Sequence, residues 1–124
     1  MNIPSDLLYT KDHEWVKIEG NQATVGVTDY AQSQLGDVVF VDIQTEGMHL
    51  DVDQEFGAIE AVKTVADALM PLSGTITQVN PDLEGNPQLL NTDPYGSGWM
   101  IKIEISNPDE LQELLSAEAY AELF

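Results

Sequence analysis

Short stretches in which apolar and polar residues alternate, separated by Gly, Asn, Asp and Pro, make up most of the chain. The stretches "EWVKIEG" and "ATVGVTD" alternate on either side of a Gly20-Asn21 pair, and this pattern predicts a β-hairpin. The stretches "GTITQVN" and "WMIKIEI" also alternate, and each predicts a strand. The run "DVVFVDI" is rich in β-branched and aromatic residues and predicts a well-buried strand. The pattern therefore indicates a mainly β domain.

A short helix is expected near residues 29–35. Asp29 is followed three residues later by Gln32, which resembles a capping box, and Gly36 is typical of the residue that ends a helix. The later stretch "PDLEGNPQLLNTDPYGSG" is rich in residues that form turns. It predicts a loop with a helical turn near Leu89-Leu90.

The spacing of apolar residues changes to that of a helix near the C-terminus. Asn107 is a favourable N-cap, Pro108 suits the first helical position, and acidic residues follow where the helix dipole favours them. These signals predict a C-terminal helix over 108–124, within which Ser116 could begin a second short helix. Three leucines at helical spacing should face the body of the domain: Leu111, Leu114 and Leu115.

The length of 124 residues predicts one domain, 1–124, with enough chain to bury a core. No apolar run approaches the ~20 residues that a membrane-spanning helix needs. The N-terminus has neither a basic region with an apolar stretch nor an Arg, so it does not resemble a targeting segment. This predicts the cytoplasm of a bacterium, with a mature organellar protein as the alternative. The chain has no Cys, which excludes disulfides and zinc-thiolate sites.

The formal net charge is -18, because 22 acidic residues face only four Lys. Such a charge repels nucleic acid phosphates and anionic lipid, so neither is expected as a partner. It favours electrostatically steered encounters with basic protein surfaces, although a merely solvated surface would have the same composition. We expect a monomer.

Few residues of the chain could carry out catalysis. His occurs only as His13 and His49, so no catalytic triad or His-rich metal site can be assembled. The phosphate-binding glycine motifs are missing, and "DVDQE" lacks the Gly and the later Glu of a calcium loop. We therefore expect no metal and no catalysis by the chain alone, so that a group attached to it would supply any chemistry.

Lys63 is the candidate for that attachment. It lies among small and β-branched residues within a predicted hairpin around 57–74, "GAIEAVKTVADALMPLSG". A Lys at such a turn projects into solvent, where an acylating enzyme could convert its ammonium to a neutral amide. The spacing alone favours an ordinary solvated Lys over an attachment site.

The hairpin stretch "GAIEAVKTVADALMPLSGTITQVN" resembles the modified-lysine hairpin of biotinyl and lipoyl carrier domains. More narrowly, the chain is similar to the H proteins of the glycine cleavage system. This similarity runs from "YTKDHEWVKIEG" through "VGVTDYAQSQLGDVVFVDI" to "DPYGSGWMIKIEISNPDEL", in order and with similar spacing. It covers nearly the whole chain, which makes it far more specific than the hairpin alone.

The resemblance implies a flattened barrel-sandwich hybrid of the biotinyl/lipoyl-like class with a helical C-terminus. It also implies lipoic acid in amide linkage to Lys63. The carrier would take the aminomethyl group of glycine from a pyridoxal-phosphate-dependent glycine decarboxylase to a tetrahydrofolate-dependent aminomethyltransferase. Dihydrolipoamide dehydrogenase would then reoxidise the lipoyl group. Together with the lipoylating enzymes, these proteins are the implied partners, and the chain itself would not be an enzyme.

The resemblance further implies a cleft into which the loaded arm folds. Glu14 of "HEW" is the expected partner of the amine on the arm, because a carboxylate accepts charge-assisted hydrogen bonds. Asp67 is a second candidate for the cleft or for contact with the lipoylating enzyme, and Glu60 is a candidate for recognition by that enzyme. The chain departs from many members of the family at Tyr30 and Gln34, where His is found in them.

Four alternatives use the same hairpin differently. A biotin carrier usually has Met on both sides of the Lys, where this chain has Val62 and Thr64. A lipoyl domain of a 2-oxo acid dehydrogenase is shorter and is followed by a linker. An H-like protein could relay lipoyl groups to other enzymes without serving glycine cleavage. An acidic interaction module would leave Lys63 unmodified.

Overall fold

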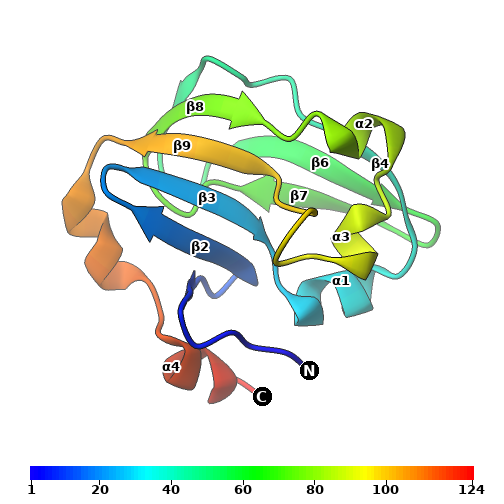
Figure 1. Cartoon of the computed structure of the whole chain (residues 1–124), viewed down its shortest axis with the longest axis horizontal. Helices are drawn as coiled ribbons and strands as arrows, with labels where there is room; N and C mark the ends of the chain where they lie inside the picture. The colour runs from blue at the N-terminus through cyan, green and yellow to red at the C-terminus, as the bar shows by residue number, and fades with distance from the viewer.

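The computed structural model describes all residues, 1–124, as two β-sheets flanked by short helices (Figure 1). The strands are β1 Leu8–Tyr9, β2 Glu14–Glu19, β3 Gln22–Val27, β4 Val38–Asp42, β5 His49–Leu50, β6 Glu55–Ala61, β7 Val65–Leu69, β8 Gly74–Val79 and β9 Ile101–Ile105. The helices are α1 Asp29–Leu35, α2 Asp82–Gly85, α3 Leu89–Thr92, the 3-10 helix η1 Pro108–Glu113 and α4 Ala117–Ala121. None of the helices is long and apolar enough to cross a membrane.

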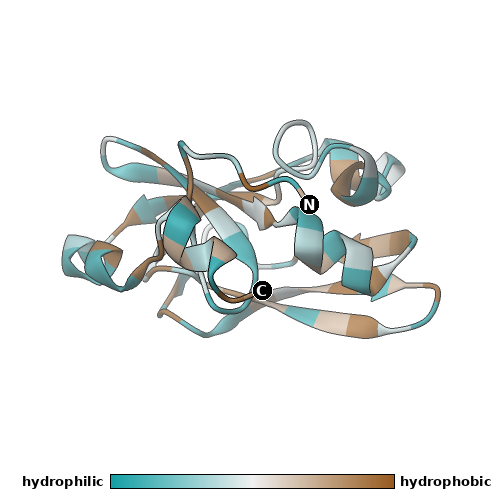
Figure 2. Cartoon of the chain, turned by 90° about the horizontal axis from the view of Figure 1, so that it is seen from below, coloured by the Kyte–Doolittle hydropathy of each residue, from teal (hydrophilic) through white to brown (hydrophobic).

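All the strand pairs in the two sheets are antiparallel. The larger sheet has the order β1-β2-β3-β9-β8-β5, and the smaller has the order β4-β6-β7. The sheets lie one above the other in Figure 2, and the β6–β7 hairpin extends beyond the rest of the molecule at one side. The predicted mainly β, flattened barrel-sandwich is therefore confirmed.

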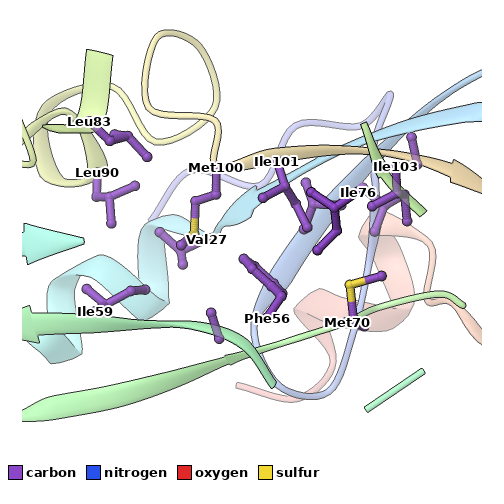
Figure 3. Close-up of a cluster of buried hydrophobic side chains, with 14 of the residues drawn as sticks. Val27, Phe56, Ile59, Met70, Ile76, Leu83, Leu90, Met100, Ile101 and Ile103 are labelled. Atoms are coloured by element: carbon purple, nitrogen blue, oxygen red, sulfur yellow. The ribbon is translucent and has the colours of Figure 1, made fainter. Parts of the chain in front are cut away.

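The main hydrophobic core fills the space between the two sheets. Figure 3 shows Phe56 and Met70 from the side of the smaller sheet facing Ile76, Ile101 and Ile103 of the larger one. All five side chains are almost completely buried. Burying a large apolar side chain contributes about 1.5–3 kcal/mol each, so this layer is the main force that holds the sheets together.

A second, smaller core lies on the outer face of β1 and β2. Its five buried residues come from the N-terminal segment, β1, β2 and α4: Leu7, Tyr9, Trp15, Ala117 and Tyr120. The rings of Tyr9 and Tyr120 stack with centroids 4.6 Å apart. Trp15 is buried in this core, although it shares alternate positions along β2 with the exposed Lys17 and Glu19. The C-terminal segment covers this face.

The prediction of a well-buried strand in "DVVFVDI" is wrong. β4 is an edge strand, and its side chains Val39 and Phe40 are 51% and 45% exposed. The register of β4 against β6 shifts between Val38 and Phe40. Such an irregularity breaks the alternation of faces, which explains why two successive residues are both exposed.

The helix predicted near 29–35 is confirmed as α1, but its cap differs from the prediction. The N-cap is Thr28, whose Oγ1 accepts a hydrogen bond from the backbone N–H of Ala31. Asp29 is the first helical residue and accepts a hydrogen bond from the side chain of Gln32. The helical turn at Leu89-Leu90 is present as part of α3.

The C-terminal segment does not form one helix over 108–124. The 3-10 helix η1 ends at Glu113, and the α-helix α4 begins at Ala117. Between them Leu115 exchanges two backbone hydrogen bonds with Tyr9, which requires extended backbone there. The predicted cap at Ser116 is present, since its side chain accepts from the N–H of Ala119, whereas Asn107 makes no side-chain cap.

Candidate functional site

Lys63 lies at the tip of the β6–β7 hairpin, with its side chain exposed. The turn is closed by a hydrogen bond of 2.8 Å from the N–H of Ala61 to the carbonyl of Thr64. The neighbouring side chains Val62 and Val65 are 76% and 63% exposed, so the Lys is presented on an uncovered apolar surface. This arrangement is the exposed hairpin lysine that the sequence predicts.

An apolar pocket of about 270 Å³ opens beside this hairpin. One wall is formed by α1, through Tyr30 and Gln34, and the opposite wall by β7 and the residue before it. Three residues on that second wall line the pocket at alternate positions: Thr64, Ala66 and Ala68. Because Thr64 directly follows Lys63, the pocket begins where the lysine hairpin ends.

The floor of the pocket is formed by residues of the main hydrophobic core, among them Phe56, Ile59 and Met100. These residues lie in the interior between the sheets in Figure 3. Asp12, His13 and Glu14 contribute the polar part of the lining. The pocket is therefore an apolar cavity with carboxylates and an imidazole at its edge.

Glu14 is buried in this pocket, with 6% of its surface exposed. Its Oε2 accepts a hydrogen bond of 3.0 Å from the N–H of Leu69, and its Oε1 accepts one of 3.1 Å from the hydroxyl of Thr10. Burial raises the pKa of Glu14 to about 8, although these two hydrogen bonds oppose the shift. The side chain can therefore be neutral near pH 7 and become ionised when a cation approaches. It is not the ordinary surface carboxylate that is typical of a strand.

Aromatic rings surround the mouth of the pocket near His13. The ring of His13 lies 4.6 Å from that of Tyr30, and Phe124 packs 4.7 Å from Tyr30 by ring centroids. The Nδ1 atom of His13 and the hydroxyl of Thr28 are each 2.8 Å from the hydroxyl of Tyr120. Burial lowers the pKa of His13, which favours the neutral imidazole. α4 thus holds one side of the site in place.

The other two candidate carboxylates lie outside the interior of the pocket. Asp67 is exposed and contributes to the rim, and its charge raises the pKa of the nearby Glu55. Glu60 is exposed on β6, paired with Phe40 on one side and Val65 on the other, and does not line the pocket. Of the three candidates, only Glu14 is placed to meet a group inside the cavity.

The sequence gives no signal for several residues that shape this site. Tyr120 and Phe124 reach it from the end of the chain, and Phe56, Ile59 and Met100 form its floor. Their role follows from contacts between distant segments, which no local pattern reports. A larger hollow of about 390 Å³ lies elsewhere, along β4 and α2, and contains none of the predicted site residues. The structure contains no group of three or more residues that could hold a metal ion.

Comparison with known proteins identifies relatives over the whole length. A family model described as "Glycine cleavage H-protein" matches residues 7–124. The glycine cleavage system H protein of Salinibacter ruber is 56% identical over 123 residues, which is 99% of both chains. That of Bacteroides fragilis is 53% identical over 97% of this chain and 95% of its own.

A solved structure agrees with these relatives. The crystal structure of a glycine cleavage system H protein from Mycobacterium marinum is 36% identical and covers 98% of both chains, with a TM-score of 0.86. The two-sheet fold, the exposed hairpin lysine and the adjoining pocket agree with the resemblance found in the sequence. The chain belongs to the glycine cleavage H-protein family.

Proposed function

We propose that Lys63 is the residue through which this chain serves as the lipoyl carrier of glycine cleavage, with lipoate in amide linkage to its Nζ. The observation that carries the proposal is the place of Lys63 at an exposed hairpin tip beside an apolar pocket. An exposed primary amine is accessible to a lipoylating enzyme. The pocket next to it gives the attached chain a place to return to.

The pocket fits an arm of this chemistry. Nine of its 16 lining residues are hydrophobic, which suits a hydrocarbon chain and a sulfur-containing ring. Its volume of about 270 Å³ lies just below the range of roughly 300–1,000 Å³ typical of small-molecule sites, so it suits the end of the arm. When bound, the lipoyl group supplies the sulfur chemistry that carries the aminomethyl group of glycine.

Glu14 is proposed to receive the cationic end of the loaded arm. A positive charge nearby stabilises the carboxylate, so its pKa of about 8 would fall as the cation enters and its proton would leave to solvent. The apolar walls exclude water, which strengthens this ion pair. The residue thus holds the arm only when the arm carries a cation, which distinguishes loaded from empty carrier.

We further propose the partners that this role requires. They are a pyridoxal-phosphate-dependent glycine decarboxylase, a tetrahydrofolate-dependent aminomethyltransferase, dihydrolipoamide dehydrogenase and the lipoylating enzymes. Membership of the family supports this set. The chain acts as a carrier between these enzymes, and a tethered arm raises the effective concentration of the carried group in each complex. Relatives in bacteria support a place in the bacterial cytoplasm.

The test is the mass of the protein purified from its native cells, followed by mapping of the modified peptide. A lipoyl increment on the peptide that contains Lys63 is the expected result. A biotinyl increment would instead assign the chain to carboxylases. An unmodified Lys63 in cells that contain lipoate would overturn the proposal.

A further inference from the structure

The hairpin tip that bears Lys63 is attached to the corner between α1 and β4. The N–H of Val62 donates a hydrogen bond of 3.0 Å to the carbonyl of Asp37. The side chain of Lys63 lies against Gly36, where a Cβ would sit only 3.2 Å from its Cε. The position of the tip therefore depends on where residues 36–38 are held.

Regular structure holds this corner only in part. The N–H of Gly36 donates to the carbonyl of Gln32 at the end of α1, and Val38 pairs with Ala61 of β6. Gly36 has φ 75° and ψ -155°, a conformation that is essentially restricted to glycine. The ladder between β4 and β6 is irregular immediately after Val38. α1 therefore reaches one side of Asp37 and the β4–β6 ladder reaches the other, and the ladder loses its regular register directly after Val38.

The side-chain amide of Asn91, on α3, joins the two sides of the corner. Its Oδ1 accepts a hydrogen bond of 2.9 Å from the N–H of Val38, and its Nδ2 donates one of 2.8 Å to the carbonyl of Gly36. The two bonds lie on either side of Asp37. The same Nδ2 donates to Oε1 of Gln32 at 3.2 Å, so the amide also contacts the helix that forms one wall of the pocket.

We propose that Asn91 is a positioning residue for Lys63. A single half-buried amide connects the pocket wall, through Gln32, to the hairpin tip, through Asp37 and Val62. It sets the place of the lysine relative to the mouth of the pocket. This inference rests on the proposed function of Lys63 for its consequence, but the link between Asn91 and the tip stands on the geometry alone.

A hairpin tip held by Asn91 lowers the entropic cost of two steps, which are the attachment of the lipoyl group and the return of the arm to the pocket. A fixed tip presents Lys63 to a lipoylating enzyme in one conformation, so less freedom is lost on binding. A fixed tip also directs the attached arm towards the pocket, which favours its return. Without Asn91 the β6–β7 strands would remain paired, while the tip beyond Ala61 would move away from Gly36.

Hydrogen exchange of backbone amides tests the link without any lipoyl group. In the wild type, the amide of Val62 should be protected although it lies at a hairpin tip. In Asn91→Ala, and in the isosteric Asn91→Asp, which lacks the two donors, its exchange should accelerate by about tenfold or more. Amides at the centre of β2 and β3 should keep their wild-type exchange rates. Asn86→Asp, at the exposed end of α2, is the matched control for the added charge and should leave Val62 unchanged.

Kinetics of lipoyl attachment test the consequence. With lipoate, ATP and a lipoate–protein ligase, the Asn91 variants should show a KM for the carrier raised by about tenfold, with kcat little changed. An unprotected Val62 amide in the wild type would overturn the inference. In the Asn91 variants, an equal loss of amide protection in all strands would also overturn it, as would a KM for the carrier equal to that of the wild type. A wild type that is never modified at Lys63 would overturn the proposed function, but would leave the exchange result intact.

Discussion

The backbone N–H of Leu69 donates a hydrogen bond of 3.0 Å to the Oε2 atom of Glu14, and this bond joins the two sheets. Glu14 belongs to β2 of the larger sheet and Leu69 to β7 of the smaller one. The carboxylate at the pocket is therefore a structural group as well as the proposed partner of the arm. Its protonation contributes both to the stability of the fold and to binding.

Replacing Glu14 by Gln should change how stability depends on pH. Burial raises the pKa of Glu14 from 4.5 in the unfolded chain to about 8 in the fold, so the folded state retains a proton that the unfolded state releases. The favourable contribution of this bound proton to the free energy of unfolding is complete below pH 4.5, and it is lost as the pH rises through about 8. Gln has no such proton, so wild type should lose stability relative to Glu14→Gln by on the order of a few kcal/mol over this range. Chemical denaturation of both proteins near the two ends of that range, at about pH 5 and about pH 9, measures this difference. A difference that is the same at both values would contradict the raised pKa.

Replacing Lys63 by Arg should separate folding from carrier function. Arg keeps the charge and a long side chain but cannot form the lipoyl amide. Because Lys63 is exposed, the unfolding free energy should stay within about 0.5 kcal/mol of the wild type. Incorporation of lipoate and glycine-dependent turnover with the other components should be abolished. Lys17→Arg, at an exposed lysine on β2, is the control and should retain both. Turnover by Lys63→Arg at the wild-type rate would show that the group is attached elsewhere.

Removing the hydroxyl of Tyr120 should loosen the C-terminal side of the site. That hydroxyl lies 2.8 Å from both the Oγ1 of Thr28 and the Nδ1 of His13, so Tyr120→Phe leaves two polar groups without their partner. The expected loss of stability is about 1–3 kcal/mol by thermal or chemical denaturation. Tyr30→Phe is the matched control, because Tyr30 contributes its ring to the same cluster. An equal effect of the two substitutions would mean that ring packing, not the hydrogen bonds, stabilises this region.

Adding a methyl group at Gly26 should disturb the second core. A Cβ there would lie 2.6 Å from Nε1 of Trp15, whose indole N–H donates to the carbonyl of Pro94. The rigid indole must move or lose that bond, so Gly26→Ala should destabilise the fold by about 1–3 kcal/mol. Gly85→Ala, where a Cβ meets open space, should have little effect. Trp fluorescence during unfolding measures both, and a harmless Gly26→Ala would contradict the tight contact.

Salt should slow the association of the carrier with its partners. The net charge of -18 predicts contact with basic surfaces, and such steering is screened because the Debye length is only about 10 Å at 0.1 M salt. Stopped-flow association with glycine decarboxylase should therefore become slower as salt rises, while the denaturation midpoint changes little. An association rate that is independent of salt would show that the acidity serves only solubility.

The sequence is sufficient to predict the longer strands, because alternation reports directly which side chains share a face, but it does not predict the two-residue strands β1 and β5. It does not report whether that face is covered. The exposure of Phe40 was mispredicted for this reason, because it lies on an irregular edge strand. The burial of Trp15 under α4 is likewise not reported by the alternation of β2. The hairpin around Lys63 is a local feature that its own residues predict, but the modification of Lys63 follows only from the resemblance over nearly the whole chain.

The electrostatics of the site could be predicted only in part. Glu14 could be proposed from the resemblance, but its raised pKa depends on burial that involves the second sheet. Likewise Asn91 lies in a segment whose composition is typical of an ordinary loop, and its importance depends on contacts more than 50 residues away. Properties that depend on desolvation or on such distant contacts need the folded structure.

Phe124 packs against His13 and Tyr30 at the mouth of the pocket. A purification tag fused after Phe124 would therefore begin at the rim of the cavity rather than at a neutral end of the molecule. In recombinant protein with such a tag, we expect the pocket to bind the proposed lipoyl arm differently even though the fold is intact. Tags for quantitative work on this carrier are better removed.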